Sequence, residues 1–317
     1  MTSIDRVLVL AGGLSHEREV SQRSGRRLAD ALRVGELEVE LRDVDARLLP
    51  YLRADPPDVV FPTLHGSMGE DGSLRDVLEL AGVPYVGSDP GACRLAFDKP
   101  VAKTVVSRAG LSTPASVTLP KSVFYDLGAP AVMDRIVERL GLPLFIKPSR
   151  GGSALGASMV RTAEELPPAV VGCFGYGDTA LIERYVSGTE VTVGVIDRGA
   201  GLQTLPPVEI DPDGGVYDYA ARYTPGRTEF FAPARLDPGA LRAAEEAAAV
   251  AHATLGLRDM SRTDLIVDAD GVPHFLEVNV APGLTDTSTL PLALAAAGED
   301  LGGVGRDLLS VAATRFT

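Results

Sequence analysis

The sequence predicts an α/β protein that begins with a parallel-sheet domain and carries an antiparallel hairpin near its end. Residues 7–10 form a continuous apolar run, typical of a parallel strand covered on both faces, and a Gly12-Gly13 turn and a helical pattern follow it. Near the end, two apolar runs flank the turn composition of residues 268–271, which predicts a β-hairpin. With 317 residues, the chain is long enough for two or three domains and a sizeable core.

The composition limits the classes of partner. The net charge of −13 argues against a general nucleic-acid-binding or anionic-membrane surface, although a local cluster of Lys and Arg can still bind ATP. Cys93 and Cys173 lie far apart without metal-ligand spacing, so we expect buried thiols in a reducing compartment. The first residues do not resemble a signal peptide, and no apolar run approaches membrane-spanning length. We therefore expect a cytoplasmic protein with no nucleic-acid or membrane partner.

The first third of the chain alternates strands with helices. After the first strand we expect a helix at about 17–32, strands at 39–41 and 59–61, a helix at 73–80 and a short strand at 85–86. The strand before residue 62 leads into a glycine-rich loop that carries His65, and such strand-end loops are where α/β sheets bind ligands. Glu17 and His65 also have ordinary explanations, as a first-turn helix carboxylate and a structural histidine.

The middle segment predicts a small domain with a glycine-rich loop. We expect a helix at 98–109, a second helix ending near 140, and strands at 116–119, 144–147, 158–160 and 180–183. Lys147 ends one of these strands, and the loop that follows it, residues 148–156, is rich in Gly and Ser. It lies between two strands, whereas a P-loop lies between a strand and a helix. It is either a lid over phosphates or a plain hairpin loop, and Lys147 favours phosphate contact.

The C-terminal hairpin predicts a metal site. Glu277 and Asn279 are two residues apart, so both point to one face of their strand, and Asp264 on the other strand can lie opposite them. Two carboxylates and an amide oxygen, without Cys or His, suit Mg²⁺ held together with nucleotide phosphates. An exposed acidic hairpin is the alternative. The connection from about residue 211 to 229 is longer than most, so we expect a lid there.

Seven segments, in this order, resemble the D-alanine–D-alanine ligases of the ATP-grasp superfamily, and together they cover essentially the whole chain. The segments are GGLSHEREVS (12–21), LHGSMGEDG (64–72), FDK (97–99), KPSRGGSALG (147–156), YDYAARYT (217–224), RTDL (262–265) and EVNVAPGLTDTS (277–288). The resemblance implies an ATP-grasp fold in three units: an N-terminal Rossmann-like substrate domain (1–96), a central lid domain (97–184) and a C-terminal catalytic domain (185–317).

The resemblance also implies a reaction. ATP phosphorylates the carboxylate of one D-alanine, and the amine of a second D-alanine attacks the acyl phosphate to give D-alanyl-D-alanine for peptidoglycan precursors. The implied cofactors are ATP, as a substrate, and two Mg²⁺ ions, with Mn²⁺ as a possible substitute. The implied assembly is a homodimer.

Each implied role falls on a matching position. For the nucleotide and metal, the phosphate ligands are Lys99, Lys147 and Arg222, the adenine and ribose contacts are Glu183 and Glu190, and the Mg²⁺ ligands are Asp264, Glu277 and Asn279. For the first amino acid, Glu17 holds the ammonium in a hydrogen-bonded set with Ser153 and Tyr223, and His65 lies near the reacting carboxylate. Arg262 and the Gly283 N–H stabilise the oxyanion. For the second amino acid, Ser288, with Thr289 beside it, takes the carboxylate.

The chain departs from the family pattern around the second substrate and the lid. The departures are Phe97 for Met, Ala154 for Ser, Arg222 for Lys, Val280-Ala281 for a more polar pair and Thr289 for Leu. They leave the ATP and metal chemistry intact but keep an alternative open, a related ligase whose second substrate is D-serine, D-lactate or a specialised-metabolite amino acid. A nucleotide-binding regulatory protein without turnover is a third hypothesis, which the complete set of Lys and metal-ligand positions disfavours.

Overall fold

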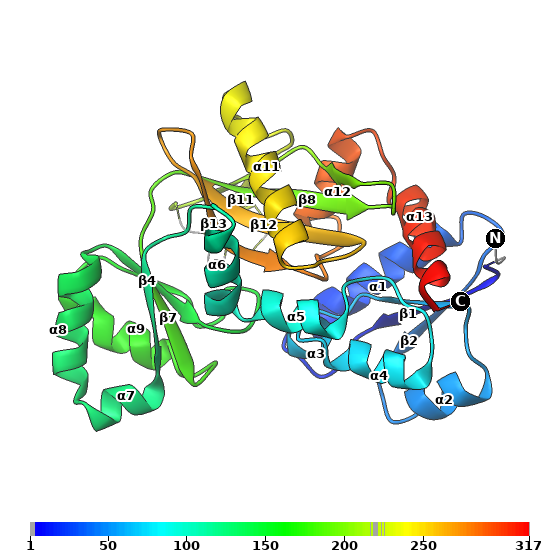
Figure 1. Ribbon diagram of the computed structural model, residues 1–317, viewed down its shortest axis with the longest axis horizontal. Coiled ribbons are helices and arrows are strands. Elements are labelled where there is room, and N and C mark those ends of the chain that lie inside the picture. Colours follow the sequence, from blue (N-terminus) through cyan, green and yellow to red (C-terminus); the bar gives the residue numbers. More distant parts are fainter. Residues whose placement is uncertain (1–3, 216, 218–220, 223, 225, 317) are drawn as a thin grey trace.

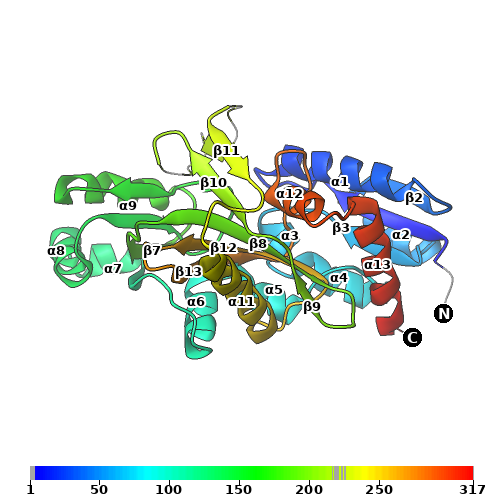
Figure 2. The same ribbon diagram turned by 90° about the horizontal axis from the view of Figure 1, so that it is seen from above.

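Three β-sheets organise the part of the chain that the computed structural model describes, which is residues 4–215, 217, 221–222, 224 and 226–316. The sheets follow one another along the long axis of the molecule, with the sheet of the C-terminal segment in the middle (Figures 1 and 2). This spatial order differs from the sequence order, because the chain builds the two outer sheets first and then returns to the centre.

The N-terminal sheet is parallel, with strand order β2-β1-β3. Its elements are β1 (Arg6–Ala11), α1 (Arg18–Leu32), β2 (Glu38–Asp43), α2 (Leu48–Ala54), β3 (Val59–Pro62), α3 (Ser67–Glu70) and α4 (Ser73–Ala81). The central strand β1 is almost wholly buried, as the continuous apolar run predicts. Helices α2 and α4 pack on one face of the sheet, and α1 packs on the other together with the C-terminal helix α13 (Leu301–Ala313). The end of the chain therefore covers its beginning (Figure 1).

The sheet of the middle segment is antiparallel, with strand order β4-β7-β5-β6. Its elements are β4 (Ser116–Pro120), α7 (Lys121–Asp126), α8 (Ala129–Leu140), β5 (Leu144–Pro148), β6 (Ser158–Val160), α9 (Leu166–Cys173) and β7 (Thr179–Arg184). Leu144 and Ile146 of β5 enter the core under these helices. Because side chains alternate along a strand, Lys147 points to the opposite face, which lines a cleft.

The C-terminal sheet is antiparallel, with strand order β11-β10-β8-β12-β13 and β9 beside β8. Its strands are β8 (Thr189–Asp197), β9 (Leu202–Thr204), β10 (Val208–Pro212), β11 (Thr228–Phe231), β12 (Met260–Val267) and β13 (Pro273–Asn279). Its helices are α5 (Pro90–Phe97), α6 (Lys99–Arg108), α11 (Pro238–Thr254) and α12 (Thr289–Ala296). Helices α5 and α6 come early in the sequence, yet they pack with α11 in the core of this sheet.

The hairpin formed by β12 and β13 confirms the predicted turn and places Asp264 directly opposite Glu277. The strand expected at residues 85–86 is wrong, because only a single bridge joins Tyr85 to Val60. Both cysteines are buried free thiols, as expected. None of the helices in the described ranges combines the length and the apolar composition that crossing a bilayer requires.

Packing of α1 on β1 gives a testable expectation. A Cβ added at Gly25 would lie 2.5 Å from the Cβ of Ala11 and 3.0 Å from Thr63 Oγ1, so Gly25→Ala should destabilise the protein by about 1–3 kcal/mol. Gly172→Ala is the matched control, because its added Cβ meets nothing within 4 Å and Ala has the higher helix propensity. Thermal unfolding should show a lower midpoint for Gly25→Ala only. Equal midpoints for the two variants would contradict this packing argument.

Candidate functional site

Two neighbouring cavities lie where the three sheets meet. The larger, of about 390 Å³, lies between the middle and C-terminal sheets, and the smaller, of about 130 Å³, extends to the loops of the N-terminal sheet. Asp264 and Glu277 line both cavities, and so do Tyr217 and Arg222. The hairpin predicted from the sequence therefore stands at the boundary between the two.

A buried carboxylate between two lysines forms one wall of the larger cavity. Lys147 Nζ lies 2.9 Å from Glu183 Oε2, and Lys103 of α6 donates to the other oxygen, Oε1, and to the Pro114 carbonyl at 3.0 Å. Burial opposes ionisation of Glu183, but the charges of Lys147 and Lys103 outweigh it and lower the pKa of this carboxyl. Glu183 is thus a fixed anion, and the cation Lys147 faces the cavity beside it.

Glu190 of β8 stands in a different environment at the same cleft. Its removal from bulk water raises the pKa to about 7, although the charge of Arg222 acts in the opposite direction. The guanidinium of Arg222 stacks 4.4 Å from the ring centre of Tyr217. Among the described residues, the buried Nε of Arg222 has no hydrogen-bond partner, so the side chain has a free donor at the boundary of the two cavities.

Each carboxylate among the predicted metal ligands is paired with a positively charged side chain. Arg262 donates to both oxygens of Asp264, at 2.7 and 2.8 Å, and Lys99 Nζ lies 3.2 Å from Glu277 Oε2. Burial opposes ionisation of Glu277, but Lys99, Lys147 and Arg222 lower its pKa to about 2. Asn279 reaches Asp264 with its amide at 3.4 Å.

These donors fit a magnesium ion only when the nucleotide contributes ligands. Within the described part of the chain, no group of three or more His, Cys, Asp or Glu side chains could hold a metal. Two carboxylates and one amide form a hard-oxygen set, which is the type that Mg²⁺ shares with phosphate oxygens and water. In this structure, Lys99 neutralises Glu277 and Arg262 neutralises Asp264.

Glu17 reaches across the small cavity to the glycine-rich loop of the middle segment. Its Oε1 accepts a hydrogen bond from Ser153. Gly66 and Gly152 leave room for the carboxylate, since a Cβ at either position would lie 2.6 Å or 2.9 Å from a Glu17 oxygen. This loop therefore contacts a residue that stands just before α1, and its role as a lid over phosphates stays a prediction.

His65 is buried and uses both ring nitrogens within the protein. Nδ1 lies 3.0 Å from the Ala281 carbonyl, which can only accept, so Nδ1 carries the proton. Nε2 lies 3.0 Å from Ser24 Oγ. Burial lowers the pKa of His65 to about 4, so the ring is neutral at physiological pH and Nε2 accepts from the Ser24 hydroxyl. His65 lines the small cavity, and its ring nitrogens bind Ser24 and Ala281.

Gly283 and Ser288 pack directly against each other in the loop before α12. A Cβ at Gly283 would lie 2.6 Å from Ser288 Oγ, and the Thr285 N–H donates to that oxygen at 3.1 Å. Both residues line the small cavity, together with Thr289. The Thr289 hydroxyl is buried, and no described residue hydrogen-bonds to it.

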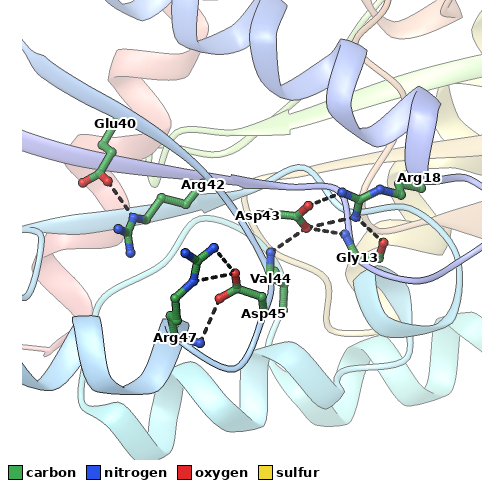
Figure 3. Close-up of polar contacts among 8 residues, drawn as sticks. All are labelled: Gly13, Arg18, Glu40, Arg42, Asp43, Val44, Asp45 and Arg47. Carbon is green, nitrogen blue, oxygen red and sulfur yellow. Dashed lines mark hydrogen bonds and ion pairs between the residues drawn. The ribbon is translucent and has the colours of Figure 1, made fainter.

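A polar cluster at the end of β2 fixes the loop that leads to Glu17. Figure 3 shows Asp43 pointing toward Arg18 and the Gly13 backbone, and its Oδ1 accepts from the Gly13 N–H at 2.9 Å. Arg18 in turn donates to the Gly13 carbonyl at 2.6 Å. Gly13 has a φ of 77°, a conformation that favours glycine. The cluster thus holds the turn between β1 and α1.

Several site residues escaped the motif analysis. Glu70 lines the small cavity, and burial and the nearby Glu17 carboxylate raise its pKa to about 8. Lys103 and Ser24 lie outside the seven segments, and only their long-range contacts show what they bind. The available signal for Glu70 was its place in the glycine-rich segment 64–72, directly after Gly69. Tyr223, predicted to join Glu17 and Ser153, lies outside the described residues.

The chain is similar to known proteins in sequence and in structure. The sequence profiles of the D-ala D-ala ligase N-terminus and C-terminus match residues 50–88 and 105–309. A D-alanine–D-alanine ligase of Anaeromyxobacter dehalogenans is 43% identical over 92% of each chain. Among solved structures, the D-alanine–D-alanine ligase of Bacillus anthracis complexed with ATP superposes with a TM-score of 0.82 at 27% identity, covering 99% of this chain and 98% of that one. The VanG D-Ala:D-Ser ligase of Enterococcus faecalis superposes with a TM-score of 0.84 at 29% identity, covering 98% of this chain and 99% of that one.

The fold and the cleft between two antiparallel sheets define an ATP-dependent ligase of the ATP-grasp class. Within that class, the chain belongs to the D-alanine–D-alanine ligase family. The resemblance in the seven segments is confirmed.

The environment of His65 predicts a pH dependence of stability. The folded protein keeps the ring neutral down to a pKa of about 4, whereas an unfolded chain protonates it near 6.5. The contribution is therefore fully present above pH ~6.5 and is lost as the pH falls toward 4, by about 3 kcal/mol in total. Urea unfolding should show that His65→Asn loses less stability than the native protein over this range.

The control for this experiment is His16→Asn, which removes an exposed histidine. If the pH profile of His65→Asn is as steep as that of the His16→Asn protein, the buried neutral ring is not the source of the dependence.

Proposed function

We propose that this protein joins two D-alanine molecules with ATP, through a D-alanyl phosphate, to make the dipeptide of peptidoglycan precursors. One observation carries the proposal. The small cavity is lined by a carboxylate suited to an ammonium (Glu17), an arginine and a backbone N–H suited to an oxyanion (Arg262, Gly283) and a hydroxyl suited to a carboxylate (Ser288), and it adjoins the larger cleft at the Asp264–Glu277 pair.

In the first step, a carboxylate oxygen of the first D-alanine attacks the γ-phosphorus, and the bond between that phosphorus and ADP breaks. Lys99, Lys147 and Arg222 line the larger cavity, and their positive charges would hold the phosphates. Glu183 and Glu190 would contact the adenine and the ribose. Glu183 is ionised, which favours an amine-bearing base as donor.

In the second step, the amine of the second D-alanine attacks the carbonyl carbon, and the bond from that carbon to the phosphate oxygen breaks. Inorganic phosphate leaves, and the proton that the amine loses passes to this phosphate or to water. Arg262 and the Gly283 N–H would stabilise the oxyanion that forms on the way. Ser288 would bind the second carboxylate. His65 would not exchange protons in this scheme, because both of its nitrogens are already bonded.

Asp264, Glu277 and Asn279 would hold Mg²⁺ together with phosphate oxygens. The metal supplies charge neutralisation between the β- and γ-phosphates when it is bound. When these carboxylates bind the metal, Lys99 and Arg262 would no longer need to neutralise them and would be free to contact the reacting groups.

We also propose a cytoplasmic homodimer, which the family resemblance supports. The same resemblance supports the division into units 1–96, 97–184 and 185–317, each with one sheet. Helix α6 belongs to the second unit by sequence but packs on the sheet of the third, so it would tie the two together.

A substrate panel tests the proposed function. The protein is supplied with ATP and D-alanine alone, with added D-lactate, and with added D-serine, near neutral pH. We expect phosphate release in all three, with D-alanyl-D-alanine as the main product by mass spectrometry. A mixed product in excess would support the alternative ligase instead. Absence of phosphate release with every substrate would refute the proposed function.

The metal assignment predicts the behaviour of Glu277→Gln. The change keeps the size of the side chain and removes its charge, so we expect kcat to fall by about two orders of magnitude or more. Binding of ADP without metal, measured by calorimetry, should change much less. Thr263→Val, at a neighbouring position whose hydroxyl bonds to no described residue, is the control. Normal turnover by the Gln variant would show that Glu277 is not a metal ligand.

A further inference from the structure

One face of helix α1 connects the two amino-acid positions of the small cavity. Glu17 stands just before the helix, and Ser21, Ser24 and Arg27 follow at helical spacing of four, three and three residues, so they share a face. Ser21 binds within the N-terminal domain, since it accepts from the Gly12 N–H at 2.8 Å and donates to the Thr63 carbonyl at 3.0 Å. Ser24 and Arg27 instead reach the loop that carries Gly283.

Ser24 closes a ring of hydrogen bonds around that loop. The Leu284 N–H donates to Ser24 Oγ at 3.1 Å, and the Ser24 hydroxyl donates to His65 Nε2. His65 Nδ1–H then donates to the Ala281 carbonyl. Ala281 and Leu284 are the residues on either side of Pro282-Gly283, so the segment is held at both ends. Ser24, His65, Ala281 and Leu284 are all buried, which makes each bond costly to lose.

Arg27 holds the next part of the same loop. Its Nη1 donates to the carbonyls of Leu284 and Thr285, at 2.9 and 2.8 Å, and its Nε lies 3.1 Å from Asp286 Oδ1. Thr285 in turn fixes Ser288, through its N–H at 3.1 Å and its hydroxyl at 2.8 Å. The fork of Arg27 therefore acts on Ser288 through the backbone of Thr285.

We propose that Ser24 and Arg27 are positioning residues for the second half of the reaction, a role that rests on the proposed function. Ser24 and Arg27 set the direction of the Gly283 N–H and the position of Ser288 relative to Glu17. One helix, α1, therefore positions the groups that bind both amino acids. Neither residue lines the larger cavity, where the nucleotide would bind. Because a displacement of about 1 Å at a reacting centre can cost on the order of 10²-fold in rate, loss of either residue affects amide formation far more than acyl phosphate formation.

The experiment compares Ser24→Ala and Arg27→Met with matched controls. Ser21→Ala removes a buried serine from the same face of α1 without touching the loop, and Arg26→Met changes the exposed neighbouring arginine. Amide hydrogen exchange of residues 281–288 reports on the loop directly. Steady-state kinetics give KM for each D-alanine, and positional isotope exchange in labelled ATP with D-alanine reports acyl phosphate formation.

We expect Ser24→Ala and Arg27→Met to speed amide exchange in the loop, raise KM for the second D-alanine and lower kcat by about 10- to 100-fold, with isotope exchange within about twofold of the native enzyme. Arg26→Met should match the native protein in all measurements. Ser21→Ala should leave amide exchange in the loop unchanged even where it lowers thermal stability.

Native loop exchange and native second-site KM in both variants would overturn the inference while leaving the proposed function standing. A native protein that makes no dipeptide would instead refute the proposed function, and the amide-exchange result would still decide whether α1 orders the loop. Should Ser24→Ala fail to fold, Arg27→Met carries the test alone, since Arg27 is partly exposed.

Discussion

The site depends on the register of β12 against β13, which brings three charged side chains and one amide together on one face of the hairpin. Arg262 faces Asn279 and Asp264 faces Glu277, and a bulge follows Asp264 before the strands continue. Arg262 neutralises Asp264 and Lys99 neutralises Glu277, because two carboxylates this close would otherwise be costly to keep ionised away from water. A shift of one residue would turn every one of these side chains to the opposite face.

The carboxylates of the cleft differ in charge because their neighbours differ. Lys103 and Lys147 keep Glu183 ionised, whereas Glu190 has a pKa of about 7 and Glu70 of about 8, both raised by burial. Environments that separate the pKa values of similar groups in this way give those groups different roles. Lys103 contributes without lining either cavity, since α6 brings it behind Glu183 from the core of the C-terminal sheet.

The sequence could predict what depends on local periodicity. The alternation along β13 was enough to put Glu277 and Asn279 on one face, the predicted turn allowed Asp264 to lie opposite them, and the apolar run at β1 was enough for a buried parallel strand. The pairing of Lys103 with Glu183, 80 residues away, could not be predicted, nor could the contact of Ser24 with Leu284 across 260. These contacts depend on how separate sheets pack, which no spacing in one segment encodes.

The glycine-rich loop at residues 148–156 and the first substrate can both bind the carboxylate of Glu17 in the proposed reaction. Ser153 and Ala154 have φ values of 56° and 54°, a left-handed conformation that costs non-glycine residues about 1–2 kcal/mol each. The hydrogen bond from Ser153 to Glu17 helps to offset this cost. An ionised carboxylate has about four lone-pair sites, so Glu17 can accept from Ser153 and from an ammonium group together. In the proposed reaction, binding of the first amino acid and closure of the loop therefore reinforce each other.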